Sequence, residues 1–387
     1  MLDLHQLRLQ FADFNVYQSR EQARLKDKLW QALEALNDCG PHWRALREQA
    51  ETMPQSWLVA GLREDPTQTV TSIERPTPIT VVATDGSQIY PDRHVEPHCY
   101  LLNISRIAFQ YGTAERPLME SVPRFEYRRE AFDEAFDQVL GTATADVVSA
   151  LRDEFELAAL FDVAQQARMP GRPILALADG TLIRWMLRRM RDYALEQQLI
   201  DRYTSHLAKF QAEAIPFCSY ISMPGNTEVV NLLRLHRGER DDDPDPETSL
   251  SGVLDRWLFE RILQPGERSA VFESASHIQR EYGARDRICY FYVHVAAQRG
   301  GAEVGRVEVP RWVADDPALL DLVHATVLSE CEKGKGYPMI LSEAHERAVI
   351  RARERDLFYD MIEREMTSAG LRQTGSRKQA SKRRPRV

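Results

Sequence analysis

The sequence has few cysteines, and it has no long apolar run. Its five cysteines are scattered, and no two of them form a C-x-x-C pair. This argues against a disulfide framework or a cysteine zinc site, because both need paired cysteines at short spacing. No stretch approaches the roughly 18 apolar residues of a membrane span, and the N-terminus lacks the pattern of a secretory signal peptide. We therefore expect a cytoplasmic protein with reduced thiols and no membrane contact.

The sequence also lacks an excess of positive charge and a glycine-rich phosphate loop. Its 50 Lys and Arg against 58 Asp and Glu give a formal net charge of −8. Any surface that binds nucleic acid must therefore be local. Without a Walker-type loop, nothing indicates a P-loop nucleotide site. With 387 residues, 43% of them hydrophobic, the chain can form one large domain with appendages, or two domains.

Two apolar stretches end in the same order of Asp, Gly and a hydroxyl residue. Residues 79–87 read ITVVATDGS, and residues 174–181 read ILALADGT. We interpret both as buried strands that end at Asp85 and Asp179, where open α/β sheets place their chemistry. A single Asp-Gly pair more often marks a turn. Two converging carboxylates repel each other unless a cation lies between them, so the repeated pattern predicts a shared Mg²⁺ or Mn²⁺ site. Such metal sites serve phosphodiester cleavage.

A third acid is expected from the helix predicted over residues 145–167. Helical spacing places Glu154 beside the apolar face of this helix and Glu156 on the far side. Periodicity alone therefore favours Glu154 as the third acid. For Glu156, an ion pair with Arg152 on a solvated helix face is the alternative.

His345 lies where residues 338–341, read as a short strand, lead into a helix predicted over residues 342–367. A histidine at such a corner can ligate a metal or protonate a leaving group, and a structural role is the alternative.

Three arginines recur at helical spacing after the second aspartate. Arg184, Arg188 and Arg191 follow an i, i+4, i+7 pattern in a helix predicted over residues 182–214. A cationic stripe of this kind suits contacts to DNA phosphates, while ordinary surface arginines are an equally weighted alternative.

The remaining patterns indicate a mixed α/β fold. Residues 1–60 look helical, with a break at Cys39-Gly40-Pro41 and an apolar face for either the chain's own core or another subunit. Residues 65–78 read as a linker. Residues 371–387 hold seven Lys or Arg and no acid, which indicates a disordered tail. Further strands are predicted over residues 100–111 and 117–127, in a meander with 79–87, and over 217–222, 270–272, 288–294 and 303–309; further helices over 229–235, 253–263 and 316–332.

In their order along the chain, several motifs resemble those of the NurA nucleases. They are VVATDGSQIYPDRH, RDEFEL, ALADGTLI, YISMPG, RVEVPRW and GYPMILSEAHE, and they extend from about residue 80 to residue 350. The resemblance implies an RNase H-like core with a mixed sheet, an N-terminal helical region and a long C-terminal helix. It divides the chain into a helical region with its linker (residues 1–75), a nuclease domain (76–370) and the basic tail (371–387). Met223 and the acidic residues 239–247 depart from the family's pattern and leave the DNA path open.

The resemblance also implies an activity. It is a Mn²⁺-dependent deoxyribonuclease, with Mg²⁺ as the alternative ion, that acts as a 5′→3′ exonuclease and an endonuclease. A homodimer would resect DNA ends in double-strand break repair together with a HerA-type hexameric ATPase. The family's metal ligands and catalytic residues fall on Asp85, Glu156, Asp179 and His345, so the motif selects Glu156 where periodicity favours Glu154.

Two other functions stay open from the residues alone. One is a non-catalytic adaptor that cradles DNA for a hexameric ATPase, and the other is an RNase H-like nucleotide phosphohydrolase that uses the same acids. DNA cleavage by the purified protein argues against the first, and phosphate release from ATP favours the second.

Overall fold

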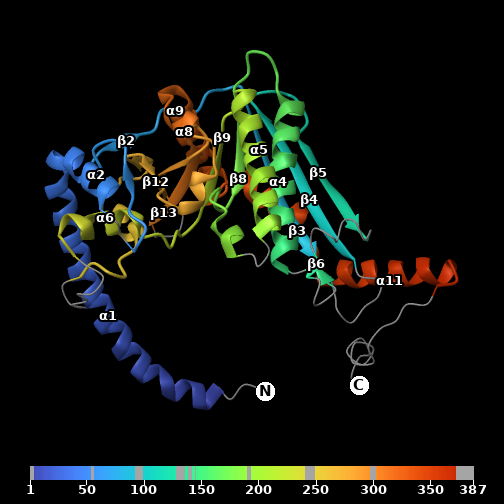
Figure 1. The fold of residues 1–387 in the computed structure, drawn as a ribbon, viewed down its shortest axis with the longest axis horizontal. Helices are drawn as coiled ribbons and strands as arrows, with labels where there is room; N and C mark the ends of the chain where they lie inside the picture. Colours follow the sequence, from blue (N-terminus) through green and yellow to red (C-terminus); the bar gives the residue numbers. More distant parts are fainter. Residues whose placement is uncertain are drawn as a thin grey trace.

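The computed structural model describes residues 4–53, 56–91, 99–127, 136–137, 142–143, 145–189, 193–239, 249–296 and 302–371. The chain starts with the long helix α1 (Leu4–Cys39), the 3₁₀ turn η1 (Gly40–His42) and α2 (Trp43–Thr52). In Figure 1, α1 (blue) and α11 (Ala352–Ser368, red) lie at opposite ends of the molecule, with a twisted sheet between them.

Within the described residues, one 11-stranded mixed sheet organises the fold. Two short strands lie off its main path, where β10 (Glu267–Ser269) pairs with both β12 and β2 (Thr69–Thr71). The order along the main path is β1 (Gly61–Leu62), β11 (Phe272–Glu273), β12 (Ile288–Ala296), β13 (Ala302–Pro310), β9 (Phe217–Ile221), β8 (Ile174–Asp179), β3 (Ile79–Ile89), β4 (Tyr100–Tyr111) and β5 (Leu118–Glu126).

The centre of the sheet is parallel, and the predicted meander forms one side of it. β8 lies parallel to both β3 and β9, whereas β3, β4 and β5 pair antiparallel as the sequence predicted. Parallel neighbours need a crossover connection, and α4 (Ala145–Ala167) and α5 (Tyr193–Ala212) lie in the two connections. Both helices pack side by side on one face of the sheet (Figure 1). Residues 81–83 of β3 are fully buried, as expected for a strand covered on both faces.

The other helices cover the remaining surface of the sheet. α9 packs on β8, β9 and β12, and α10 packs on β3 and β4. α6 and α7 pack together with α1 in a second apolar cluster. The bounds are α6 (Glu228–His236), α7 (Asp255–Ile262), α8 (Arg311–Ala314), α9 (Pro317–Lys333) and α10 (Met339–Ala348), with 3₁₀ turns η2 (Trp185–Arg189) and η3 (His277–Arg280) and a small hairpin of β6 (Phe136–Asp137) and β7 (Thr142–Ala143).

The prediction that a strand ends at Asp85 is wrong. β3 continues to Ile89, because Asp85 pairs with Ser105 and the pairing with β4 persists to the end of the strand. An Asp-Gly sequence is a turn signal only where no neighbouring strand holds it extended, and here β4 does so.

Five further predictions of local structure are wrong. The helix expected over 182–214 is a 3₁₀ turn followed by α5, and the strand expected over 338–341 mostly belongs to α10. The long helix expected over 342–367 is broken between α10 and α11, where Asn103 of β4 donates a hydrogen bond to the Ala348 carbonyl (2.9 Å) and so satisfies a helix-end acceptor. The expected linker contains β2. Of the strand expected over 270–272, only Phe272 belongs to a strand, β11, and β10 ends before it at Ser269.

The two halves of helix α1 differ in what their apolar side chains contact. Leu29 and Leu36 are buried in the second cluster, so the C-terminal half packs on the chain's own core. Trp30, expected on the same face, is 62% exposed. The N-terminal half exposes several large apolar side chains, namely Leu4, Phe11, Phe14, Val16 and Tyr17.

Candidate active site

The first part of the site joins residues that lie 260 positions apart. Asp85 lies within β3, and its Oδ2 is 2.9 Å from Nδ1 of His345 on α10. Asp85 Oδ1 accepts a hydrogen bond from the Gly86 N–H (2.8 Å). Ser87 donates to the Ala348 carbonyl, which fixes the end of α10 against β3. The His345 side chain is 65% exposed, so this corner is accessible from solvent.

Asp179 adds a second carboxylate from the end of β8, the position that the sequence predicted. Its Oδ1 accepts a hydrogen bond from the Tyr337 hydroxyl (2.8 Å). Burial raises the pKa of Asp179, the hydrogen bond from Tyr337 opposes this rise, and the charge of Asp85 adds to it. His345 lowers the same pKa. The parallel pairing of Ala83 with Leu177 places Asp85 and Asp179 two residues further along two neighbouring strands, at the same level of the sheet.

Glu156 approaches the same strand from α4. A Cβ at Gly86 would lie only 2.5 Å from Glu156 Oε1, so the glycine makes room for this carboxylate. Burial raises the pKa of Glu156 to about 8, Arg152 opposes the shift, and Asp153 and Asp85 reinforce it. Glu154, which helix periodicity favoured, lies instead near His206 and Arg202 of α5, 3.6 and 3.7 Å away.

The pleat of β3 separates these groups into two sides. Asp85 and Ser87 contact α10, whereas Thr84 donates to the Glu156 carbonyl of α4 (2.9 Å), and Gly86 borders the Glu156 side chain. This is the alternation that a strand imposes on successive residues. The structure therefore brings Asp85 and His345 into direct contact and places Glu156 across the strand at its glycine.

Comparison with known proteins decides the family. A family model of the NurA domain matches residues 79–350, which is most of the chain. The chain belongs to the NurA domain family. No curated protein matches it significantly.

Two solved structures are similar to this chain. The crystal structure of the NurA nuclease from Sulfolobus solfataricus matches with a TM-score of 0.54 at 12% identity, covering 95% of this chain and 98% of that chain. A second NurA crystal structure matches with a TM-score of 0.36 at 13% identity, covering 89% of this chain and 97% of that one. At this identity the first match shows a shared fold. The predicted mixed α/β sheet with an N-terminal helical region is confirmed, and two helices, α10 and α11, follow it at the C-terminal end in place of the single long helix that was expected.

Arg184 and Arg188 do not form the predicted helical stripe. Arg184 precedes the η2 turn, is largely buried, and pairs with Asp153 (Nη1 to Oδ2, 3.2 Å). Arg188 lies in η2 and pairs with Glu196 (2.7 Å) and with Glu281. Both cations are thus engaged by carboxylates, and Arg191 lies outside the described residues. So do most of the acidic residues 239–247 and nearly all of the basic tail.

Two residues near the site were missed by the sequence argument. Asp153, one position before Glu154 in the RDEFEL motif, is buried and pairs with both Arg152 (2.8 Å) and Arg184. Tyr337, in the GYP motif, holds Asp179. Both lie in quoted motifs, but a tyrosine or a second acid in a helix carries no local signal of function.

The donor set suits a divalent metal in kind. Carboxylate oxygens and an imidazole are ligands that Mn²⁺ accepts. Burial, and to a smaller extent the charge of Asp85, raises the pKa of Asp179, and a bound cation would offset both effects. Among the described residues, however, no three His, Cys, Asp or Glu side chains form a group that could hold an ion. Each carboxylate is instead paired with a protein donor, such as His345 for Asp85 and Tyr337 for Asp179.

None of the helices in the described part of the chain has the length and apolar character needed to cross a bilayer.

Proposed function

We propose that this NurA-family chain is a metal-dependent DNA nuclease that hydrolyses phosphodiester bonds. The observation that carries the proposal is the contact between Asp85 Oδ2 and His345 Nδ1, which are 2.9 Å apart. Both residues also influence the pKa of Asp179. The NurA nuclease from Sulfolobus solfataricus shares the fold, which supports the same reaction class.

The residues have distinct roles in this proposal. Asp85, Glu156, Asp179 and His345 would hold Mn²⁺ or Mg²⁺. When bound, the ion would supply activation of a water molecule and neutralisation of charge on the scissile phosphate. When Nδ1 of His345 donates to Asp85, Nε2 is the ring nitrogen whose lone pair is available to the ion. Tyr337 orients Asp179 through its hydrogen bond.

The arginines contribute less directly than the sequence suggested. Arg184 is tied to Asp153, so its charge acts on the site from a fixed position beside α4. Arg188 is partly exposed, and a DNA phosphate would have to compete with two glutamates for it. Arg191 stays a predicted phosphate contact.

We further propose that the protein acts as a 5′→3′ exonuclease and an endonuclease and resects DNA ends in double-strand break repair. In this proposal it is a cytoplasmic homodimer whose partner is a HerA-type hexameric ATPase. The exposed apolar side chains on the N-terminal half of α1 support an intermolecular contact there, because unpartnered apolar surface on a soluble protein commonly marks an interface.

The test is cleavage of end-labelled linear DNA by the purified full chain with Mn²⁺, with Mg²⁺ and with EDTA. We expect metal-dependent cutting, and we expect Asp85→Ala and Asp179→Ala to lower its rate by about a hundredfold or more, since several kcal/mol of charge stabilisation depend on a bound metal. Asp162→Ala, which removes an exposed carboxylate from α4, is the matched control and should cut normally. If Asp85→Ala protein remains folded and cuts like the wild type, the proposal is wrong.

A further inference from the structure

A small cavity lies beside the candidate active site. Its volume is about 380 Å³, within the range of about 300–1,000 Å³ that is usual for ligand pockets. It adjoins the end of β8, since Thr181 lines it and follows Asp179 by two positions. The YISMPG segment, which the sequence motifs singled out, contributes Ile221 to the wall.

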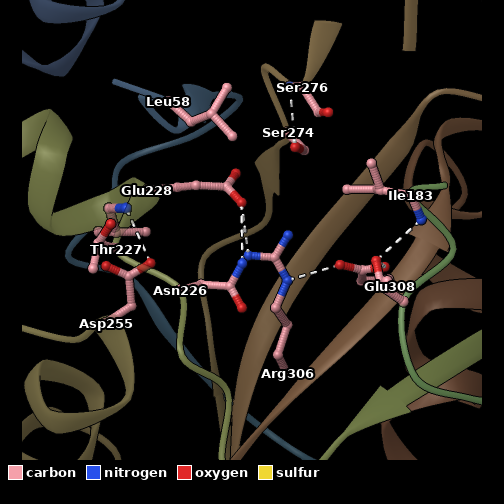
Figure 2. Close-up of polar contacts among 12 residues, drawn as sticks. Leu58, Ile183, Asn226, Thr227, Glu228, Asp255, Ser274, Ser276, Arg306 and Glu308 are labelled. Carbon is pink, nitrogen blue, oxygen red and sulfur yellow. Dashed lines mark hydrogen bonds and ion pairs between the residues drawn. The ribbon is translucent and has the colours of Figure 1, made fainter. Parts of the chain in front are cut away.

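The floor of the cavity is a buried network of charges around Arg306 of β13 (Figure 2). Arg306 is 0% exposed, and its Nε donates to Glu308 Oε1 (2.9 Å) while its Nη1 donates to Glu228 Oε1 (3.2 Å). The centroid of the Tyr290 ring lies 3.5 Å from the guanidinium carbon of Arg306. The other oxygen of Glu308 accepts from the Thr181 hydroxyl (2.9 Å) and the residue 182 N–H (2.8 Å).

Two atoms of this network have no partner. Among the described residues, neither Arg306 Nη2 nor Glu228 Oε2 makes a hydrogen bond, although both atoms are buried. In Figure 2, no dashed line joins Nη2 to either glutamate. An unsatisfied buried donor or acceptor costs about 1–3 kcal/mol, and more when it is charged. A ligand that offers an acceptor to Nη2 and a donor to Oε2 would satisfy both atoms at once.

The charges select the class of ligand. One arginine is countered by two glutamates, so the cavity has no positive charge to spare for a phosphate or a carboxylate. A neutral group with an acceptor beside a donor fits better. Every DNA base has this pair on its Watson–Crick edge, which is the edge that enzymes read when a base leaves the stack.

The walls also suit a planar ring. Ile183 and Ile221 supply apolar surface, and the side chain of Trp185, which is 47% exposed, lines the same cavity. Aromatic side chains bind unpaired bases by stacking, with little preference for sequence.

We propose that this cavity binds an unpaired nucleobase of the DNA strand whose backbone passes the Asp179 carboxylate. This inference rests on the proposed nuclease function and deepens it. A base can enter only after it leaves the stack, so the preferred substrate is single-stranded DNA or a frayed end. Stacking on the ring is common to all four bases, so it makes binding tolerant of base identity.

The test is binding of a fluorescently labelled single-stranded oligonucleotide in EDTA, where no cleavage occurs, measured by anisotropy. A series of oligonucleotides carries one abasic position, moved along the strand. We expect a single position at which base removal weakens binding by about tenfold, the loss of one stacked base. Trp185→Ala and Glu228→Gln should abolish the difference between intact and abasic DNA at that position. Glu228→Gln replaces the free acceptor with a donor at nearly constant shape, and Trp30→Ala on α1 is the matched control.

Several results would overturn the inference. If the protein binds and cuts DNA but no abasic position matters, the cavity is not a base site, and the nuclease proposal stands. If the variants weaken binding of intact and abasic DNA equally, the network around Arg306 only positions the end of β8, where Asp179 lies. If Glu228→Gln changes the oligomeric state and leaves base dependence intact, the cavity holds a protein side chain. A protein that neither binds nor cuts DNA contradicts both proposals.

Discussion

Replacing Gly86 with alanine tests how tightly the two sides of the site are packed across β3. The added Cβ would lie 2.5 Å from Glu156 Oε1, 2.9 Å from Arg152 Cγ and 2.9 Å from Ile104 Cδ1. All three atoms belong to side chains that are themselves packed, so they must move together. A shift of about 1 Å by the Glu156 carboxylate is needed to restore ordinary contact.

The expected cost of Gly86→Ala follows from this crowding. Overpacking of a filled interior lowers the free energy of unfolding by about 1–3 kcal/mol. A displacement of about 1 Å in a catalytic group can lower a rate by about a hundredfold. We therefore expect urea unfolding to show a loss within the first range, and DNA cleavage with Mn²⁺ to fall by one to two orders of magnitude.

Gly225→Ala is the matched control. Among the described residues, an added Cβ at Gly225 meets no atom within 4 Å. Both changes reduce the freedom of the unfolded chain by the same amount, about 0.4–1 kcal/mol, so their difference isolates the contact with Glu156. If Gly86→Ala is as stable as Gly225→Ala and cuts DNA at the wild-type rate, Glu156 does not need its position beside the strand, and the reasoning is refuted.

Three further changes test other parts of the structure. Burial lowers the pKa of His324 in the folded chain to about 4. Below pH 6.5 the unfolded chain therefore binds a proton at this residue, whereas the folded chain binds it only near pH 4. The free energy of unfolding should therefore fall by about 3 kcal/mol as the pH drops from 7 to 4. In urea titrations across this range, His324→Leu should show a fall that is smaller by about this amount. A pH profile equal to that of the wild type would contradict the assignment. Arg306→Met leaves Glu228 without its buried partner and should cost about 3–5 kcal/mol of unfolding free energy, with part of the loss recovered when Glu228→Gln is added; no recovery in the double variant would argue against the pair. Tyr337→Phe removes the hydrogen bond to Asp179 and should lower DNA cleavage by about tenfold while the melting temperature stays near the wild-type value; unaltered cleavage would exclude an orienting role.

Much of the local structure could be read from the sequence. The helix predicted over residues 145–167 has the bounds of α4, and the strands predicted from residues 174 and 288 begin where β8 and β12 begin. These elements carry strong periodic or apolar patterns over many residues, and such patterns depend only on neighbours along the chain.

The candidate site was predictable in part. Ordered motifs marked Asp85, Asp179 and His345, and the structure brings Asp85 into contact with His345 and sets Asp179 level with Asp85 on the neighbouring strand. The choice of Glu156 over Glu154 stays a prediction that rests on the motif; the structure adds that Glu156 lies beside Gly86, a contact between two elements that periodicity along one helix cannot show.

The sequence by itself therefore determined the helices and strands with strong patterns and the acids that the motifs mark. Only the tertiary structure decided that β3 runs on past Asp85, that β2 pairs with β10 nearly 200 residues later, and that Arg306 is buried between two glutamates. Each of these features depends on partners far away in the chain, whose hydrogen bonds and burial exist only once the sheet has formed.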